Sequence, residues 1–199
     1  MRAVPVLADW TDPRRTRPIT GVLPGVRLRN TYRGQLDERG RVALPGLVHL
    51  GDAVCTTNPT AGRGIATSLK QAQRLIRELG EHPGDPEAAT LAFDDYCTRY
   101  IRPWYDDHVA WDPDAVRQLA GADVDLSRPL TSGHITAAAD ADPRLMPLVG
   151  PYLAMYALPA TLVAAEPRAR AIYEKGWRPA VADGPTRADL AEVIRTVPR

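Results

Sequence analysis

The chain has 199 residues and a formal net charge of +1, with ordinary apolar and charged fractions, which together suit about one globular domain. No run approaches the roughly 20 apolar residues of a membrane span, and the arginines are scattered among acids, so we expect neither a membrane segment nor a nucleic-acid-binding face. The two cysteines, Cys55 and Cys97, have no metal-binding spacing. We therefore expect no metal site, and reduced thiols in a cytoplasmic protein.

The first fifty residues predict short strands. Residue types alternate over 26–32 as in a half-buried strand, and the apolar run 47–50 suits a short strand that ends at Gly51. The charged, glycine-containing stretch 36–47 predicts a turn between them.

From Gly64 onward the apolar residues recur at helical spacing. This pattern predicts an amphipathic helix that ends at Gly80 and buries the face formed by Ile65, Leu69, Ala72, Ile76 and Leu79.

A second helix is predicted to start at Asp85-Pro86, with proline in its first turn. We expect Pro103 to kink or end it, and its buried side to contain Leu91, Tyr96, Tyr100 and Ile101. The remaining chain predicts broken helices and a final helix capped by Thr186. The expected fold class is α+β, mostly α-helical with a short N-terminal β segment.

The segment "GLVHLGDAVCTTNPTAGRGIATSLKQAQRL" joins strand, loop and helix in thirty residues. Asp52 follows the expected strand, at the strand end where α/β folds bind ligands. Gly62 and Gly64 permit close backbone approach, and the first N–H groups of the helix have no partner within it. The segment thus offers an acceptor at its start and donors at its end. It lacks the GxxxxGK[ST] pattern of a phosphate-binding loop.

These residues resemble the second FAD-binding motif of the aromatic-hydroxylase class of flavoprotein monooxygenases, which flavin-dependent halogenases and geranylgeranyl reductases also carry. The family pattern is roughly GD-A-A-H-x-x-x-P-x-x-G-x-G-x-N. The positions in register are Gly51, Asp52, Ala53, Pro59, Gly62 and Gly64. The chain departs from the pattern at Cys55, where the family has His, and at Ala66, where it has Asn.

The resemblance implies a role for each position. Asp52 would accept a hydrogen bond from a ribityl hydroxyl of FAD, and Pro59 would lie beside the isoalloxazine ring. The N–H groups of Ile65 and Ala66 would point at the flavin N1–C2 edge, whose reduced form is anionic. If its side chain turned inward, Arg63 would add to the stabilisation of negative charge at this flavin edge. Otherwise it is a solvated loop charge. For Cys55, a small buried thiol is favoured over a redox or flavin-linked thiol.

Other parts of the family pattern are absent from this sequence. It contains no GxGxxG, the motif that cradles the ADP diphosphate, and no Asp-Gly pair before the flavin loop. The chain thus resembles the C-terminal portion of such an enzyme. Residues 1–50 would end the substrate-side sheet and supply the last FAD-domain strand, 51–80 would contact FAD, and 81–199 would form the C-terminal helical region. We expect it to need an N-terminal FAD-domain half as a partner.

The resemblance implies an FAD-dependent, monooxygenase-like oxidoreductase acting on a small molecule, with NAD(P)H as the possible reductant. Reduction or halogenation is an alternative chemistry on the same fold. A second interpretation is a non-catalytic remnant, or a binding module that packs with a separate N-terminal half. A gene just upstream that encodes GxGxxG would favour a split enzyme.

Further along the chain, Trp104, Tyr105 and Trp111 either wall a substrate pocket or pack in the core. The acid pairs Asp94-Asp95 and Asp106-Asp107 are expected on solvated helix faces.

Overall fold

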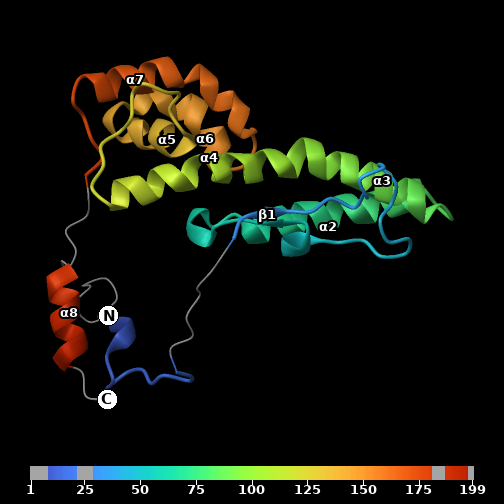
Figure 1. Cartoon of the computed structure of the whole chain (residues 1–199), viewed down its shortest axis with the longest axis horizontal. Coiled ribbons are helices and arrows are strands. Elements are labelled where there is room, and N and C mark those ends of the chain that lie inside the picture. Colours follow the sequence, from blue (N-terminus) through green and yellow to red (C-terminus); the bar gives the residue numbers. More distant parts are fainter. Residues whose placement is uncertain (1–8, 22–28, 181–186, 197–199) are drawn as a thin grey trace. The chain divides into compact units, whose positions relative to one another are not determined.

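The computed structural model describes residues 9–21, 29–180 and 187–196. It is mostly helical with one small sheet, which confirms the α+β expectation at that level. The chain clusters into two units, and the larger, Arg27–Pro179, contains the candidate site. The other contains a 3₁₀ turn at Asp9–Thr11 and α8 at Arg187–Thr196 (Figure 1). The cap expected at Thr186 lies outside the described residues.

The sheet joins the start of the larger unit to the candidate loop. Strand β1 (Thr31–Tyr32) pairs antiparallel with β2 (Cys55–Thr56). Of the strand predicted over 26–32, the last two residues therefore form a strand, and residues 26–28 lie outside the described residues.

The strand predicted at 47–50 does not form in the described part of the chain. Leu50 is extended, with φ −142° and ψ 153°, but the segment pairs with no other strand. Instead, the Gln35 side chain binds both backbone groups of His49, with Oε1 accepting the N–H at 2.9 Å and Nε2 donating to the carbonyl at 3.0 Å. A side chain here takes the place of a neighbouring strand.

Helix α2 (Gly64–Glu81) confirms the predicted helix, but the predicted buried face is wrong. Apart from the half-buried Ala72, the apolar side chains of that face are 49% to 79% exposed, and they are Ile65, Leu69, Ile76 and Leu79. The buried residues are polar, namely Thr67, Gln71 and Glu78. We call the four exposed side chains the α2 stripe. The helix turns its polar side toward α3 (Pro86–Tyr96) and the 3₁₀ turn η2 (Gly51–Ala53), leaving the stripe uncovered by described residues.

Helix α3 begins as predicted, with the Asp85 carboxylate accepting the Ala88 N–H at 2.9 Å. Pro103 does not end the helical run. A π-helical segment, Cys97–Ile101, leads directly into α4 (Arg102–Leu119), and Pro103 lies in the first turn of α4, just after this widened turn. The buried side matches the prediction in part, because Ile101 is buried and Tyr96 is half-buried, whereas Leu91 and Tyr100 are 40% and 50% exposed. Its apolar members are spaced by four, at Ala89, Phe93, Cys97 and Ile101.

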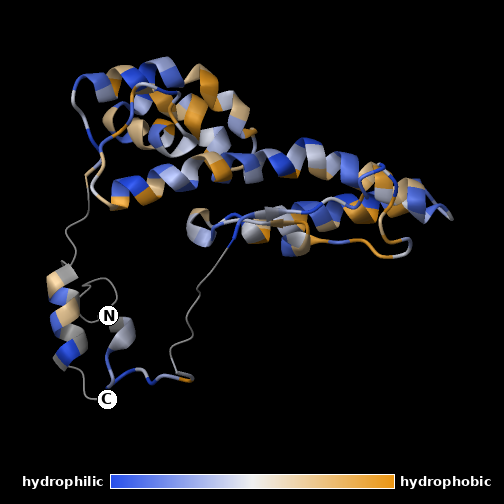
Figure 2. Ribbon diagram, in the orientation of Figure 1, coloured by the Kyte–Doolittle hydropathy of each residue, from blue (hydrophilic) through white to orange (hydrophobic). Residues whose placement is uncertain are grey.

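The remaining helices pack on α4 around the main core (Figure 1). They are α5 (Ser132–Ala141), α6 (Met146–Leu153) and α7 (Glu166–Glu174), with 3₁₀ turns at Pro143–Leu145 and Pro159–Ala164, the latter labelled η6. Figure 2 shows apolar residues gathered in the helices around α5 and α6. A second, smaller core lies beneath the candidate loop and consists of Val54, Cys55, Phe93, Cys97 and Ile101.

Candidate functional site

The candidate loop, residues 51–66, is a series of tight turns. It runs through η2, β2 and a 3₁₀ turn at Pro59–Ala61, and then enters α2. Two glycines make these turns possible, because Gly51 has φ +62° and Gly62 has φ +67°. Both values lie in the left-handed region that other residues avoid. Pro59 is exposed at the first position of its turn.

The start of the loop is fixed to the middle of α2. The Gly51 N–H donates to Oε1 of the fully buried Gln71 at 2.9 Å. A Cβ at Gly51 would lie 3.0 Å from the Ser68 hydroxyl oxygen, a close contact that would require the Ser68 side chain to shift. The polar face of α2, which pattern reasoning assigned to solvent, therefore positions the loop.

Asp52 lies beside the N-terminus of α2. Its side chain is exposed, and Oδ1 is 4.0 Å from the Cβ position at Gly64. No hydrogen bond to this carboxylate is present among the described residues, while its backbone carbonyl accepts the Thr56 hydroxyl at 2.7 Å. An open acceptor is thus adjacent to a helix start.

That helix start has unpaired donors. The N-cap residue is Arg63, whose side chain makes no capping bond, and the first intrahelical bond at this end runs from the Thr67 N–H to the Arg63 carbonyl at 3.0 Å. The N–H groups of Gly64, Ile65 and Ala66 therefore have no acceptor within the described part of the chain. They carry partial positive charge and can receive an anion or a polarised carbonyl.

Arg63 turns inward, so it is not a solvated loop charge. Its side chain is 12% exposed, and NH1 lies 3.2 Å from Oδ2 of Asp107. The guanidinium carbon is 4.7 Å from the Trp104 ring centroid and 4.5 Å from that of Tyr152. The Tyr152 hydroxyl donates to the same Asp107 oxygen at 2.7 Å. The charge of Arg63 is therefore compensated by Asp107 and held between α4 and α6.

The other side of the loop is held by amides and a carboxylate. The Asn58 N–H donates to the Asn30 side chain at 2.7 Å, and Nδ2 atoms of both asparagines donate to Asp112 on α4, at 3.2 Å and 2.5 Å. The Asn58 oxygen also accepts the Thr60 N–H at 3.0 Å, which caps the Pro59 turn. These bonds fix the loop before any ligand arrives.

The two thiols are buried and free. Burial raises the pKa of Cys55 to about 11, with the Asp52 and Asp106 carboxylates adding to the shift. Burial likewise raises the pKa of Cys97 to about 12. Both stay protonated at neutral pH, and a protonated thiol is a poor nucleophile. This state favours the packing interpretation of Cys55.

Sequence reasoning missed one face of α4. It expected Asp107 on a solvated surface, yet its side chain is 9% exposed. His108 is buried, and burial together with the Arg63 charge lowers its pKa, which keeps the ring neutral. Trp104, Asp107, His108 and Trp111 follow helical spacing, and this pattern could have indicated an inward face. Trp104 is in the core, whereas Trp111 lines a cavity of about 170 Å³ together with Arg63 and Tyr152.

In comparisons with known proteins, no family model, curated protein or solved structure matches the chain. Within the described residues, no group of three or more Cys, His, Asp or Glu side chains could hold a metal ion. None of the described helices is both long and apolar enough to cross a membrane.

Proposed function

We propose that residues 51–66 form a flavin-contacting loop of an FAD-dependent oxidoreductase. The observation that carries the proposal is the open Asp52 carboxylate beside the unpaired N–H groups of Gly64, Ile65 and Ala66. FAD offers complementary groups, since its ribityl chain has hydroxyl donors and its N1–C2 edge is electron-rich. The order of Gly51, Asp52, Pro59, Gly62 and Gly64 in the sequence gives independent support through the family resemblance.

In this proposal the chain binds and orients the cofactor. Asp52 accepts a ribityl hydroxyl, and the α2 N-terminus stabilises negative charge at the flavin edge. Pro59 lies beside the ring. Arg63 contributes mainly by holding the loop, because Asp107 already compensates its charge. Bound FAD would supply the redox chemistry, with NAD(P)H as the proposed reductant and a small molecule as the substrate.

The proposal includes a dinucleotide-binding partner unit, on this polypeptide or another. The chain offers the ribityl and flavin-edge contacts, whereas these 199 residues contain no GxGxxG for the diphosphate. The α2 stripe is exposed, and so are the apolar side chains of the preceding segment, Leu44, Leu47 and Leu50. Figure 2 shows this segment as an apolar run.

The cofactor contact can be tested on the chain itself. We expect no micromolar FAD binding by fluorescence quenching, because the adenosine contacts are missing. At millimolar FAD, amide NMR signals of residues 51–66 should shift. Asp52→Asn should weaken these shifts several-fold, because a charged acceptor is replaced by a neutral one. Asp95→Asn, an exposed change on α3, serves as the control.

The outcomes separate the two parts of the proposal. Shifts spread over the surface, or equal in both variants, would contradict a flavin-contacting loop. Tight stoichiometric binding by the chain alone would contradict the need for a partner unit and leave the loop assignment standing.

A further inference from the structure

A second cavity has Asp107 in its wall and shares Ser132 with the Arg63 cavity. It has a volume of about 280 Å³ and lies between α4, the start of α5 and η6, reaching Glu166 at the start of α7. This is close to the lower end of small-ligand sites, which span roughly 300–1,000 Å³. Its walls are mainly apolar, with Leu130, Ile135 and Leu162 among them. Nothing in the proposed flavin contact uses it.

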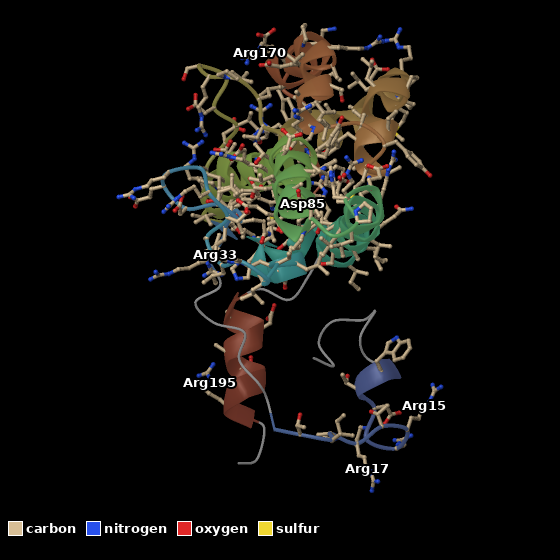
Figure 3. The ribbon with its side chains drawn as sticks, turned by 90° about the vertical axis from the view of Figure 1, so that its right-hand side faces the viewer. Arg15, Arg17, Arg33, Asp85, Arg170 and Arg195 are labelled. Carbon is tan, nitrogen blue, oxygen red and sulfur yellow. The ribbon has the colours of Figure 1, made fainter. Side chains whose placement is uncertain are left out.

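Two carboxylates line this cavity, and each has one engaged oxygen. Asp107 accepts the Tyr152 hydroxyl and Arg63 at Oδ2, and no described residue donates to Oδ1. Glu166 accepts the Leu130 N–H at 3.0 Å and Arg170 at 2.7 Å, both at Oε1. Figure 3 labels Arg170 on α7. The lining residues thus retain acceptor capacity, and a fitting ligand must bring a donor.

The charges around the cavity select the kind of donor. Asp107 is paired with Arg63, and Glu166 with Arg170, so each carboxylate is already compensated. An ammonium ligand would bring an unpaired positive charge against apolar walls, which is costly. A hydroxyl brings a donor without net charge. The protein already makes such a contact, since the Tyr152 phenol donates to Asp107 at 2.7 Å.

We propose that this cavity binds a small apolar alcohol or phenol, whose hydroxyl donates to Oδ1 of Asp107. Asp107 is the better acceptor of the two because its side chain is 9% exposed, against 21% for Glu166. Hydrogen bonds to charged groups strengthen when water is excluded. The ligand would contact Asp107, which pairs with Arg63 at the N-cap position of α2, yet its binding requires no flavin.

The test compares three probes of similar size by NMR titration of the full chain without flavin. Phenol should bind at least about tenfold more tightly than toluene, which lacks the donor, and more tightly than benzylamine, which adds a charge. Ala110→Leu places extra volume at the cavity wall and should abolish phenol binding. Ala141→Leu, exposed at the end of α5, should leave it unchanged.

Asp107→Asn keeps the side-chain shape, and should reduce the preference for phenol over toluene to about twofold. If this variant folds poorly, the comparison of the three probes and the Ala110→Leu variant still test the proposal. Equal binding of phenol and toluene, tighter binding of benzylamine, or no phenol binding at millimolar concentration would overturn the proposal. Each of these results leaves the flavin test unaffected, because no flavin is present.

Discussion

At the scale of single residues, Gly51 and Gly62 share a left-handed backbone but differ in their surroundings. A Cβ at Gly51 meets the Ser68 hydroxyl at 3.0 Å, whereas nothing lies within 4 Å of one at Gly62. Ser68 is itself held by a hydrogen bond to the Gly64 carbonyl at 2.9 Å. The sequence motif marks both glycines equally, and only the folded chain shows that Gly51 is also close to a neighbouring side chain.

We therefore expect Gly51→Ala to lower the free energy of unfolding more than Gly62→Ala does. An alanine in the left-handed region costs about 1–2 kcal/mol, and this cost applies to both variants. Gly51→Ala adds the contact with Ser68, for a total of roughly 2–3 kcal/mol. Urea unfolding measures both values. The double variant Gly51→Ala/Ser68→Ala should recover part of the difference, and equal losses in the two single variants would show that crowding at Gly51 is unimportant.

At the scale of elements, the sequence predicted where α2 and α3 begin, because the signals used are local. Apolar periodicity gave the start of α2, and the Asp85-Pro86 pair gave the start of α3. Periodicity failed to predict which face of α2 is buried. The polar face is held by specific partners, such as Gln71 with the Gly51 N–H, and these contacts depend on a loop twenty residues away in sequence. The ion pair between Arg63 and Asp107 also could not be predicted from local patterns, because the two residues are 44 positions apart in the sequence. Pattern reasoning assumes that apolar faces are covered within the chain.

The exposed α2 stripe gives a direct prediction for the isolated chain. Because the side chains of Leu69 and Ile76 are 65% and 72% exposed, the double variant Leu69→Gln/Ile76→Gln should change the free energy of unfolding by no more than about 0.5 kcal/mol. It should also reduce self-association in sedimentation experiments. Leu75→Gln is the matched control, because Leu75 lies on the same helix and packs against the smaller core. That change should cost about 1–3 kcal/mol. A comparable loss in the double variant would mean that the stripe is buried in solution.

At the scale of the whole molecule, the candidate loop and the exposed apolar surface are parts of one arrangement. The polar face of α2 holds the loop, and its opposite face together with Leu44, Leu47 and Leu50 remains uncovered by described residues. A unit that covered this surface would therefore approach the same helix whose N-terminus is proposed to face the flavin. Burying an Ile or Leu side chain fully contributes about 1.5–3 kcal/mol, and the four stripe side chains, 49% to 79% exposed, would each contribute the part of this that their exposed area represents.

We accordingly expect a yellow complex when the chain is produced with a GxGxxG-containing unit. Leu69→Gln/Ile76→Gln should weaken assembly at least tenfold, as measured by calorimetry, because the two side chains lose their apolar contact. Val116→Gln on α4 is the control, since it removes a similarly exposed apolar side chain from another helix and should leave assembly intact. A colourless complex that depends on the stripe would support the binding-module interpretation. Flavin binding that ignores the stripe variant would instead place the partner on another surface.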